Sequence, residues 1–389
     1  MTDAGLRIAL LTYSTKPRGG VVHTLALAEA LAAAGQSVDV WSLSRGGDSG
    51  FFRPVDEAVG IRLVPFPDRD HETVGQRILR SITTMAAAFD PSGYDIVHAQ
   101  DCISANAVPE CIRTIHHLDR FTTPELAACH ERAIVNPAAH ICVSRSVAAE
   151  VTAGWGIAPT VIANGVDAAR FAAAASTQPD AIAARLRWQQ RLGPQFILAV
   201  GGIEPRKGTL DLIEATSTVL ETRPGMPLVI VGGETLFDYR EYRAQVDKRA
   251  AELGVEPIVL GTVPDAELPS LVAAASVFAF PSTKEGFGLA AMEALAAGVP
   301  LVTRDLPVLR EVFGSTAAYF STPQQLAEQL VEALTESAPS SGTAATARVE
   351  GRRRSGQALA QRHRWSSAAD AHLDFYRTVR CGGQLRGPN

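Results

Sequence analysis

The sequence lacks the residues that mark several common classes of protein. Its five cysteines are odd in number and form no CxxC pair, so we expect free thiols in a reducing compartment and not a disulfide framework. The net charge of −5 at pH 7 lacks the basic excess of a general nucleic-acid binder, so no nucleic-acid partner is expected. The longest apolar stretch, Leu271 to Phe280, is too short to cross a bilayer.

Several catalytic signatures are also missing. There is no GxGxxG fingerprint, which argues against hydride transfer with a dinucleotide, and no GxSxG or HExxH. No cluster of Asp, Glu and His suggests a metal, so we expect neither a metal nor a cofactor. The run Ile8 to Tyr13 is short and indicates a first strand and not a signal peptide, so a cytoplasmic protein is expected. Abundant alanine and an excess of arginine over lysine hint at a GC-rich bacterial genome.

Short apolar runs alternate with helical patterns along the whole chain. This alternation predicts parallel sheets covered by helices on both faces. Strands are expected in the first part at residues 7–13, 37–43, 61–64, 96–99, 113–115 and 141–143. After a restart they are expected at residues 196–200, 228–231, 258–260, 277–280 and 301–303. The fold class is therefore α/β, with two doubly wound Rossmann-like domains that face each other across a ligand cleft.

The boundary between the two domains is predicted from a turn signal. Val161 to Asp167 reads as a strand that ends in Asn-Gly, so the hinge is placed there. The first domain is expected to span residues 1–165, joined by a C-terminal helix (366–389) that crosses back to it. The second domain is expected to span residues 166–365. The alanine- and serine-rich stretch 338–347 is expected to be a surface connection.

The segment from Ser282 to Glu293 is the most informative part of the chain. A glycine-bearing turn joins the strand ending at Phe280 to a helix predicted from Gly288 to Ala297. Backbone N–H groups at a helix start bind anions, phosphate above all. Glu285 precedes the helix and Glu293 lies one turn inside it, and carboxylates accept hydrogen bonds from sugar hydroxyls. Glu285 could instead cap the helix and interact with its dipole. Glu293 lies among apolar residues of the helix, where a carboxylate needs a partner.

One glycine-bearing turn follows the first strand of each domain. Gly19-Gly20 opens the first helix, where paired glycines would let the backbone approach a ligand, although a plain turn is equally compatible. The second turn, Gly201 to Gly208, carries Arg206 and Lys207, two adjacent cations that suit a diphosphate. It lacks the GK[ST] triplet, so a Walker motif is rejected.

Histidines at strand ends are weaker candidates. His98 and His116 each follow a strand of the first domain, where a lone histidine is more often a hydrogen-bonded structural residue than a catalyst. His116 and His117 would point to opposite faces if the strand continued, so both cannot face a cleft.

The ordered set of these motifs resembles the signature of family 4 glycosyltransferases of the GT-B fold. The resemblance covers nearly the whole chain and rests on Gly19-Gly20-Val21, Asp95 to His98, Thr114 to His116, Asn164 to Asp167, Arg206-Lys207-Gly208, Glu285 to Leu289, Glu293-Ala294, Ala297 to Pro300, Arg364-Trp365 and Tyr376-Arg377.

The resemblance implies a retaining hexosyltransferase that uses a nucleotide-sugar donor and no metal. The donor would sit on the second domain and the acceptor on the first. Glu293 would bind the ribose and Glu285 the sugar. The backbone of Phe287, Gly288 and Leu289 would hold the phosphates, which Arg206 and Lys207 would neutralise. Gly202 and Gly286 are further donor-binding candidates. Gly20 would approach the diphosphate, and His116 would lie near the transferred sugar. His116, Glu285, Lys207 and Arg206 are thus the catalytic candidates.

One departure and several alternatives stay open at this point. The family often has an arginine at the position of Gly202, and Arg206 could supply that cation. A sugar-nucleotide-binding protein without activity, or a sugar-nucleotide epimerase on the same architecture, is the alternative function. The helix predicted from Gln76 to Phe89 is amphipathic, but only two cations support membrane contact. The sequence does not encode a readable donor base, sugar, acceptor or oligomeric state.

Overall fold

The chain folds into two compact α/β units. The computed structural model describes residues 5–119, 121, 123–233, 239–336 and 343–381. Unit 1 consists of residues 1–165 and 365–389, and unit 2 of residues 166–364. The change of unit after Gly165 falls inside the segment where the turn signal placed the hinge.

Unit 1 is built on a seven-stranded sheet in the order β3-β2-β1-β4-β5-β6-β7, and every neighbouring pair is parallel. Its strands are short and almost fully buried at the centre, as expected for a sheet covered on both faces. They are β1 (Arg7–Leu11), β2 (Ser37–Arg45), β3 (Val59–Phe66), β4 (Ile96–Ala99), β5 (Ile112–Ile115), β6 (Ala139–Cys142) and β7 (Thr160–Val161).

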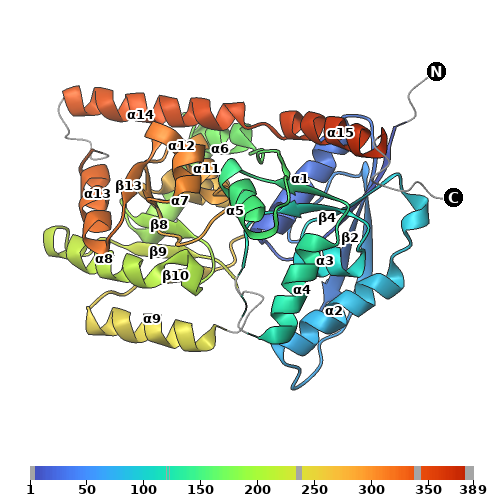
Figure 1. The fold of residues 1–389 in the computed structure, drawn as a ribbon. Coiled ribbons are helices and arrows are strands. Elements are labelled where there is room, and N and C mark those ends of the chain that lie inside the picture. Colours follow the sequence, from blue (N-terminus) through green and yellow to red (C-terminus); the bar gives the residue numbers. More distant parts are fainter. Residues whose placement is uncertain (1–4, 120, 122, 234–238, 337–342, 382–389) are drawn as a thin grey trace. The chain divides into compact units, whose positions relative to one another are not determined.

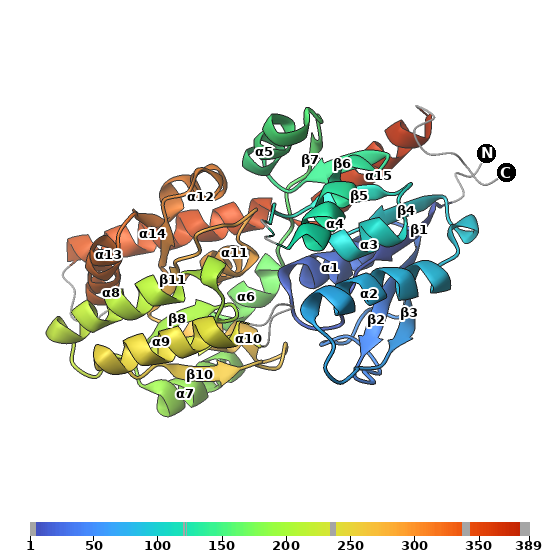
Figure 2. The same ribbon diagram turned by 60° about the horizontal axis from the view of Figure 1, so that its bottom comes forward.

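Helices pack on both faces of this sheet (Figures 1 and 2). One face carries Ile8, Leu10 and their neighbours, which pack against α1 (Gly19–Ala33) and α15 (Trp365–Cys381). The other face carries Ala9 and Leu11, which pack against α2 (Val74–Ala88), α3 (Cys102–Ala107) and α4 (Pro124–Val135). The remaining elements are η1 (Pro91–Gly93) and α5 (Arg145–Trp155). Helix α15 thus returns to the first unit, as the sequence predicts.

Unit 2 has a six-stranded parallel sheet in the order β10-β9-β8-β11-β12-β13. The chain fills one half of the sheet with β8, β9 and β10, then returns to the centre and fills the other half. The strand order therefore reverses between β8 and β11. The strands are β8 (Ile197–Val200), β9 (Leu228–Val231), β10 (Ile258–Gly261), β11 (Val277–Phe280), β12 (Leu301–Arg304) and β13 (Ala318–Phe320).

One face of the second sheet is covered by α8 (Thr209–Thr222), α9 (Arg240–Glu252) and α13 (Pro323–Glu336), whose apolar residues join one core with the strands. Helix α11 (Leu289–Ala296) contacts β11 and β12 and is itself flanked by α6 (Ala168–Ala174), α10 (Leu268–Ala274) and α14 (Thr343–Arg362). The others are α7 (Pro179–Leu192), η2 (Pro205–Lys207), α12 (Pro307–Phe313) and η3 (Gly314–Thr316).

The predicted fold class is confirmed, with three local differences. Strand β13 was missed because its run of three residues is too short to show a pattern. The expected surface connection 338–347 is wrong from residue 343 onward, where α14 has already begun, and residues 338–342 lie outside the described residues. The second domain was expected to end at residue 365, whereas Trp365 begins α15 of unit 1.

Candidate active site

The best-defined constellation of polar residues lies where the strand order of unit 2 reverses. Strands β8 and β11 are neighbours there, yet the segments that follow them lead to helices on opposite sides. In open α/β sheets, ligands bind outside the carboxyl ends of the strands at such a switch point. The two segments that carry the predicted phosphate motifs, 201–208 and 281–288, are the ones that leave the sheet at this point.

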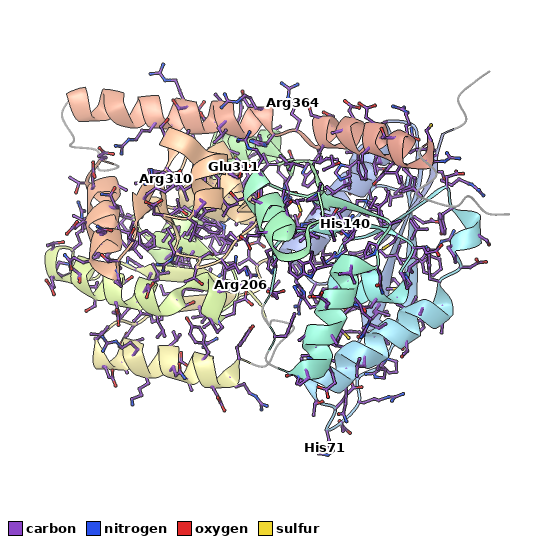
Figure 3. The ribbon with its side chains drawn as sticks, viewed as in Figure 1. His71, His140, Arg206, Arg310, Glu311 and Arg364 are labelled. Atoms are coloured by element: carbon purple, nitrogen blue, oxygen red, sulfur yellow. The ribbon has the colours of Figure 1, made fainter. Side chains whose placement is uncertain are left out.

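The segment after β8 is a tight, glycine-dependent loop. Gly208 has a φ of 65°, and a Cβ added to it would come within 2.2 Å of the carbonyl oxygen of Pro281. Only glycine combines that conformation with that approach. The short helix η2 between these constraints presents Arg206, labelled in Figure 3, and Lys207. The backbone of Gly201 and Gly202 lies against Gly232, where a Cβ would come within 2.6 Å of the Gly202 nitrogen.

Hydrogen bonds fasten this loop to the segment after β11. The backbone N–H of Thr283 donates to the carbonyl of Arg206 at 2.7 Å, and the Thr283 hydroxyl donates to the same carbonyl at 3.2 Å. The carbonyl of Pro281 accepts from Nε of Arg304 at 3.0 Å, and Arg304 also pairs with Asp211. Two segments about 80 residues apart in sequence therefore form one structure, which fixes the two cations relative to Glu285.

The centre of the site is an ion pair between Lys207 and Glu285. Nζ of Lys207 lies 2.6 Å from Oε1 of Glu285, and the two side chains are only 17% and 11% exposed. Arg206 is 3.5 Å from the same carboxylate oxygen and 2.7 Å from Oε1 of Glu204. Burial on its own would raise the pKa of Glu285, but the charges of Lys207 and Arg206 hold it at about 2. Glu285 is therefore ionised at neutral pH. The N-cap of the following helix is Gly288, and no side-chain cap hydrogen bond is made there.

The helix that follows begins with open backbone donors. Gly288 precedes α11 in the left-handed region with a φ of 92°, and the rings of Phe313 and Phe280 pack against it. Within the described parts of the chain, no acceptor pairs with the backbone N–H groups of Phe287, Gly288 or Leu289. Such donors, aligned with the positive end of the helix dipole, suit an anion.

Glu293 lies in the middle of α11 and has a different electrostatic setting from Glu285. Its side chain makes no hydrogen bond or ion pair with any residue in the described ranges. Burial raises its pKa to about 8, and Asp265 and Asp167 add to the rise while Arg170 opposes it. Arg170 is itself paired with Asp265 at 2.7 Å. Glu293 is thus largely protonated at pH 7 and has unused hydrogen-bonding capacity.

In unit 1, His116 and Gly20 lie side by side. His116 directly follows β5, and a Cβ added to Gly20 would be 3.7 Å from Cδ2 of the His116 ring. Nε2 of His116 is buried and finds no partner among the described residues. Burial and the charge of Arg113 lower the pKa of His116 well below its ordinary value, so the ring is neutral at pH 7. A neutral imidazole with a free nitrogen can bind one hydroxyl group.

The other two histidine candidates make contacts of their own. His98 is fully buried, and its ring nitrogens pair with the hydroxyls of Tyr376 at 2.8 Å and Thr114 at 2.6 Å. His117 lies 3.3 Å from Asp119 in a more exposed position. His98 is therefore a structural residue that ties β4 and β5 to α15, and His116 alone of the three has a buried nitrogen without a partner in the described structure.

Sequence reasoning missed several residues around these groups. Glu204 holds Arg206, Arg304 holds the loop after β11, and Arg170 and Asp265 lie near Glu293. His23 packs edge-on against His116, with ring centroids 4.8 Å apart, and its Nδ1 pairs with Asn164 at 3.0 Å. Of these, only Glu204 could have been found from the sequence, because it lies within the glycine loop itself. The others come together through tertiary contacts.

Two family models match successive parts of the chain. The family described as Glycosyltransferase Family 4 matches residues 17–170, and the family described as Glycosyl transferases group 1 matches residues 180–352. Together with the two Rossmann-like sheets and the site at the switch point, these matches define the class: the protein is a glycosyltransferase.

Curated relatives agree with this class, and solved structures agree with the fold. Glycogen synthase of Mycobacterium tuberculosis is 29% identical, with 98% of this chain and 97% of the relative covered. Phosphatidyl-myo-inositol mannosyltransferase of the same organism is 28% identical over 97% and 98%. The structure of Anabaena HepE in complex with UDP-glucose superimposes with a TM-score of 0.74 at 20% identity, over 96% of this chain and all of the other. The chain belongs to family 4 of the GT-B glycosyltransferases.

Two features are absent from the described residues. None of their helices is both long and apolar enough to cross a membrane. No group of three or more His, Cys, Asp or Glu side chains among them is arranged to hold a metal ion.

Proposed function

We propose that this glycosyltransferase is a retaining enzyme that moves a hexose-type sugar from a nucleotide diphosphate donor to an acceptor hydroxyl, without a metal ion. The observation that carries the proposal is the Lys207–Glu285 pair beside the open N-terminus of α11, at the switch point of the unit 2 sheet. A sugar diphosphate requires cations for its phosphates and, next to them, a carboxylate that accepts hydrogen bonds from the sugar hydroxyls.

The diphosphate would bind between the η2 loop and the start of α11. One N–H of the Lys207 ammonium bonds to Glu285, which leaves two for phosphate oxygens, and Arg206 adds a partly exposed guanidinium. Backbone donors of Phe287, Gly288 and Leu289 complete the anion site. As the bond between the sugar and the phosphate breaks, negative charge grows on the leaving diphosphate. Fixed cations and a helix N-terminus stabilise that charge, which is the support for metal independence.

The two glutamates would divide the recognition of the donor. Glu285 is ionised and fixed by Lys207, so it can accept hydrogen bonds from sugar hydroxyls without changing its charge. Glu293 has no partner in the described structure, and its protonated form can both donate to and accept from a ribose hydroxyl. Support for a nucleotide-sugar donor also comes from HepE, a structural neighbour solved with UDP-glucose.

Retention is carried over from family 4. A pKa of about 2 makes Glu285 a poor base, so the proton of the acceptor hydroxyl would pass to a phosphate oxygen of the departing nucleotide. In that step the bond from C1 to the phosphate oxygen breaks and the bond from C1 to the acceptor oxygen forms on the same face. His116 of unit 1, with its free Nε2, would bind a hydroxyl of the transferred sugar.

The test is a panel of UDP-, GDP- and ADP-sugars incubated with an acceptor library. Release of the nucleoside diphosphate measures transfer, and proton NMR of the product gives its anomeric configuration. The proposal expects release that depends on an acceptor, is unchanged by EDTA, and yields the configuration of the donor. An inverted product would refute retention, and loss of activity in EDTA would refute metal independence. Conversion of the donor without an acceptor would indicate an epimerase.

A further inference from the structure

Three arginines near the ends of three neighbouring strands lie close to one another at one edge of unit 1. Arg18 follows β1 and is the residue directly before α1, Arg45 is the last residue of β2, and Arg77 lies in the first turn of α2, which follows β3. Strands β1, β2 and β3 are neighbours in the parallel sheet. All three arginines therefore lie at the carboxyl ends of strands, the edge at which open α/β sheets bind ligands.

Nearby carboxylates are mostly engaged by other cations. Glu72 makes a two-bonded pair with Arg80 at 2.6 and 2.7 Å, in which both side chains are nearly buried. Asp48 pairs with Lys16 at 2.8 Å. A third carboxylate, Asp68, is 63% exposed and reaches Arg45 at 3.3 Å. Two of these three carboxylates are therefore already paired with cations other than the three arginines.

Two of the three arginines, Arg18 and Arg45, also have buried donors without a described acceptor. Nε of Arg18 and Nε of Arg45 are buried and have no acceptor among the residues that the structure describes. Arg18 uses one terminal nitrogen to bond the hydroxyl of Tyr13 at 2.9 Å. Burial lowers the pKa of Arg77, and the charges of Arg45 and Arg18 lower it further against the opposing effect of Glu72 and Asp68. Repulsion between like charges and buried donors without acceptors both cost free energy. A bound anion would offset the repulsion and accept hydrogen bonds from the donors.

We propose that Arg18, Arg45 and Arg77 form an anion subsite that holds a phosphate group carried by the sugar acceptor. Guanidinium groups match the oxygens of a phosphate in pairs, which suits a converging set of arginines better than a single charge. The subsite begins two residues before Gly20, which lies against His116, so it belongs to the same edge of unit 1 as that histidine. The inference rests on the proposed function, because it assigns the anion to the acceptor of that reaction.

Inorganic phosphate is the first probe, titrated calorimetrically into the protein. The protein is first saturated with whichever of UDP, GDP or ADP binds it, which blocks the diphosphate site of unit 2. Arg18→Gln, Arg45→Gln and Arg77→Gln should each weaken phosphate binding by about tenfold or more, as expected for the loss of one charge-assisted contact. Arg18→Lys, which keeps the charge, should weaken it less.

Arg7→Gln is the matched control. Arg7 begins β1 at the opposite edge of the same sheet, is half exposed and pairs with Asp95, so its loss should leave phosphate binding unchanged. The proposal is overturned if all three test variants bind phosphate as the wild type does, or if Arg7→Gln weakens binding equally. The melting temperature of each variant without ligand shows that it is folded, and its affinity for the nucleotide shows that unit 2 is intact.

A second assay separates the two sources of such a phosphate. Vesicles of phosphatidylglycerol in phosphatidylcholine are compared in flotation with vesicles of phosphatidylcholine alone. Flotation that requires phosphatidylglycerol and is lost in the three variants indicates a lipid headgroup. Phosphate binding without flotation indicates a soluble phosphorylated acceptor. If no nucleotide binds at all, the proposed function fails, whereas the phosphate titration still reports on the arginines by themselves.

Discussion

Glu293 gives the sharpest prediction about stability, because its half-buried side chain has a strongly raised pKa and no partner in the described structure. Its pKa rises from an ordinary 4.5 to about 8, a difference of about 3.5 units. At about 1.4 kcal/mol per unit, this corresponds to at most about 5 kcal/mol of linkage between protonation and folding. The native state holds the proton more tightly than the unfolded chain does. Stability is therefore lost as the pH rises from about 4.5 to about 8, and no further loss follows above that.

Replacement of Glu293 by Gln removes the ionisation and keeps the shape. At pH 5 the variant and the wild type should differ by less than about 1 kcal/mol, because both carry a neutral group there. At pH 9 the variant should be more stable than the wild type by roughly 2 to 5 kcal/mol, since only the wild type must bury a charge. Urea unfolding at pH 5, 7 and 9, with a probe in unit 2, measures this difference.

The control is Glu328→Gln, which removes an exposed carboxylate from α13 of the same unit. Its effect on stability should stay nearly constant over this pH range. If Glu293→Gln showed an equally flat difference, Glu293 would not be held protonated and the reasoning would be refuted. Binding of a nucleotide in buffers of different ionisation enthalpy adds a second readout, since any proton exchange at Glu293 disappears in the variant.

Two further predictions concern the loop after β8 and the histidine of unit 1. Gly208→Ala should destabilise unit 2 by more than about 2 kcal/mol, because its Cβ would lie 2.2 Å from the Pro281 carbonyl. Gly225→Ala, also at positive φ but in open space, should cost only about 1 kcal/mol by the same unfolding assay. His116→Ala should lower turnover at least about tenfold with an unchanged Kd for the nucleoside diphosphate; unchanged turnover would remove His116 from the reaction.

Much of the fold could be predicted because its strands are short, apolar and regularly spaced. Strands β4, β9 and β11 were placed to the residue, since turn signals bound them on both sides. The short edge strand β13 and the start of α14 were not, because neither has a distinctive pattern. A strand bounded by turn residues can be predicted from its own sequence, whereas a short edge element forms because of what it packs against.

The candidate site, too, could be predicted only where its residues are contiguous in sequence. Segment 282–293 could be recognised because its parts are contiguous. The pairing of Lys207 with Glu285 could not, because 78 residues separate them and only the adjacency of β8 and β11 brings them together. Nor could the sequence show that Arg206 is shared between Glu204 and Glu285, or that Glu293 lacks a partner in the described structure. Those facts depend on burial and on tertiary distances.

The central claim is that Lys207 stabilises the charge of a departing nucleoside diphosphate. The most direct measurement is kcat/KM of Lys207→Ala for the preferred nucleotide sugar, beside Lys248→Ala, which removes an exposed lysine of α9. We predict that Lys207→Ala loses about a hundredfold or more in kcat/KM with its fold intact by melting temperature, and that Lys248→Ala loses none. A value for Lys207→Ala within about threefold of the wild type, less than about 1 kcal/mol of transition-state stabilisation, would contradict the account.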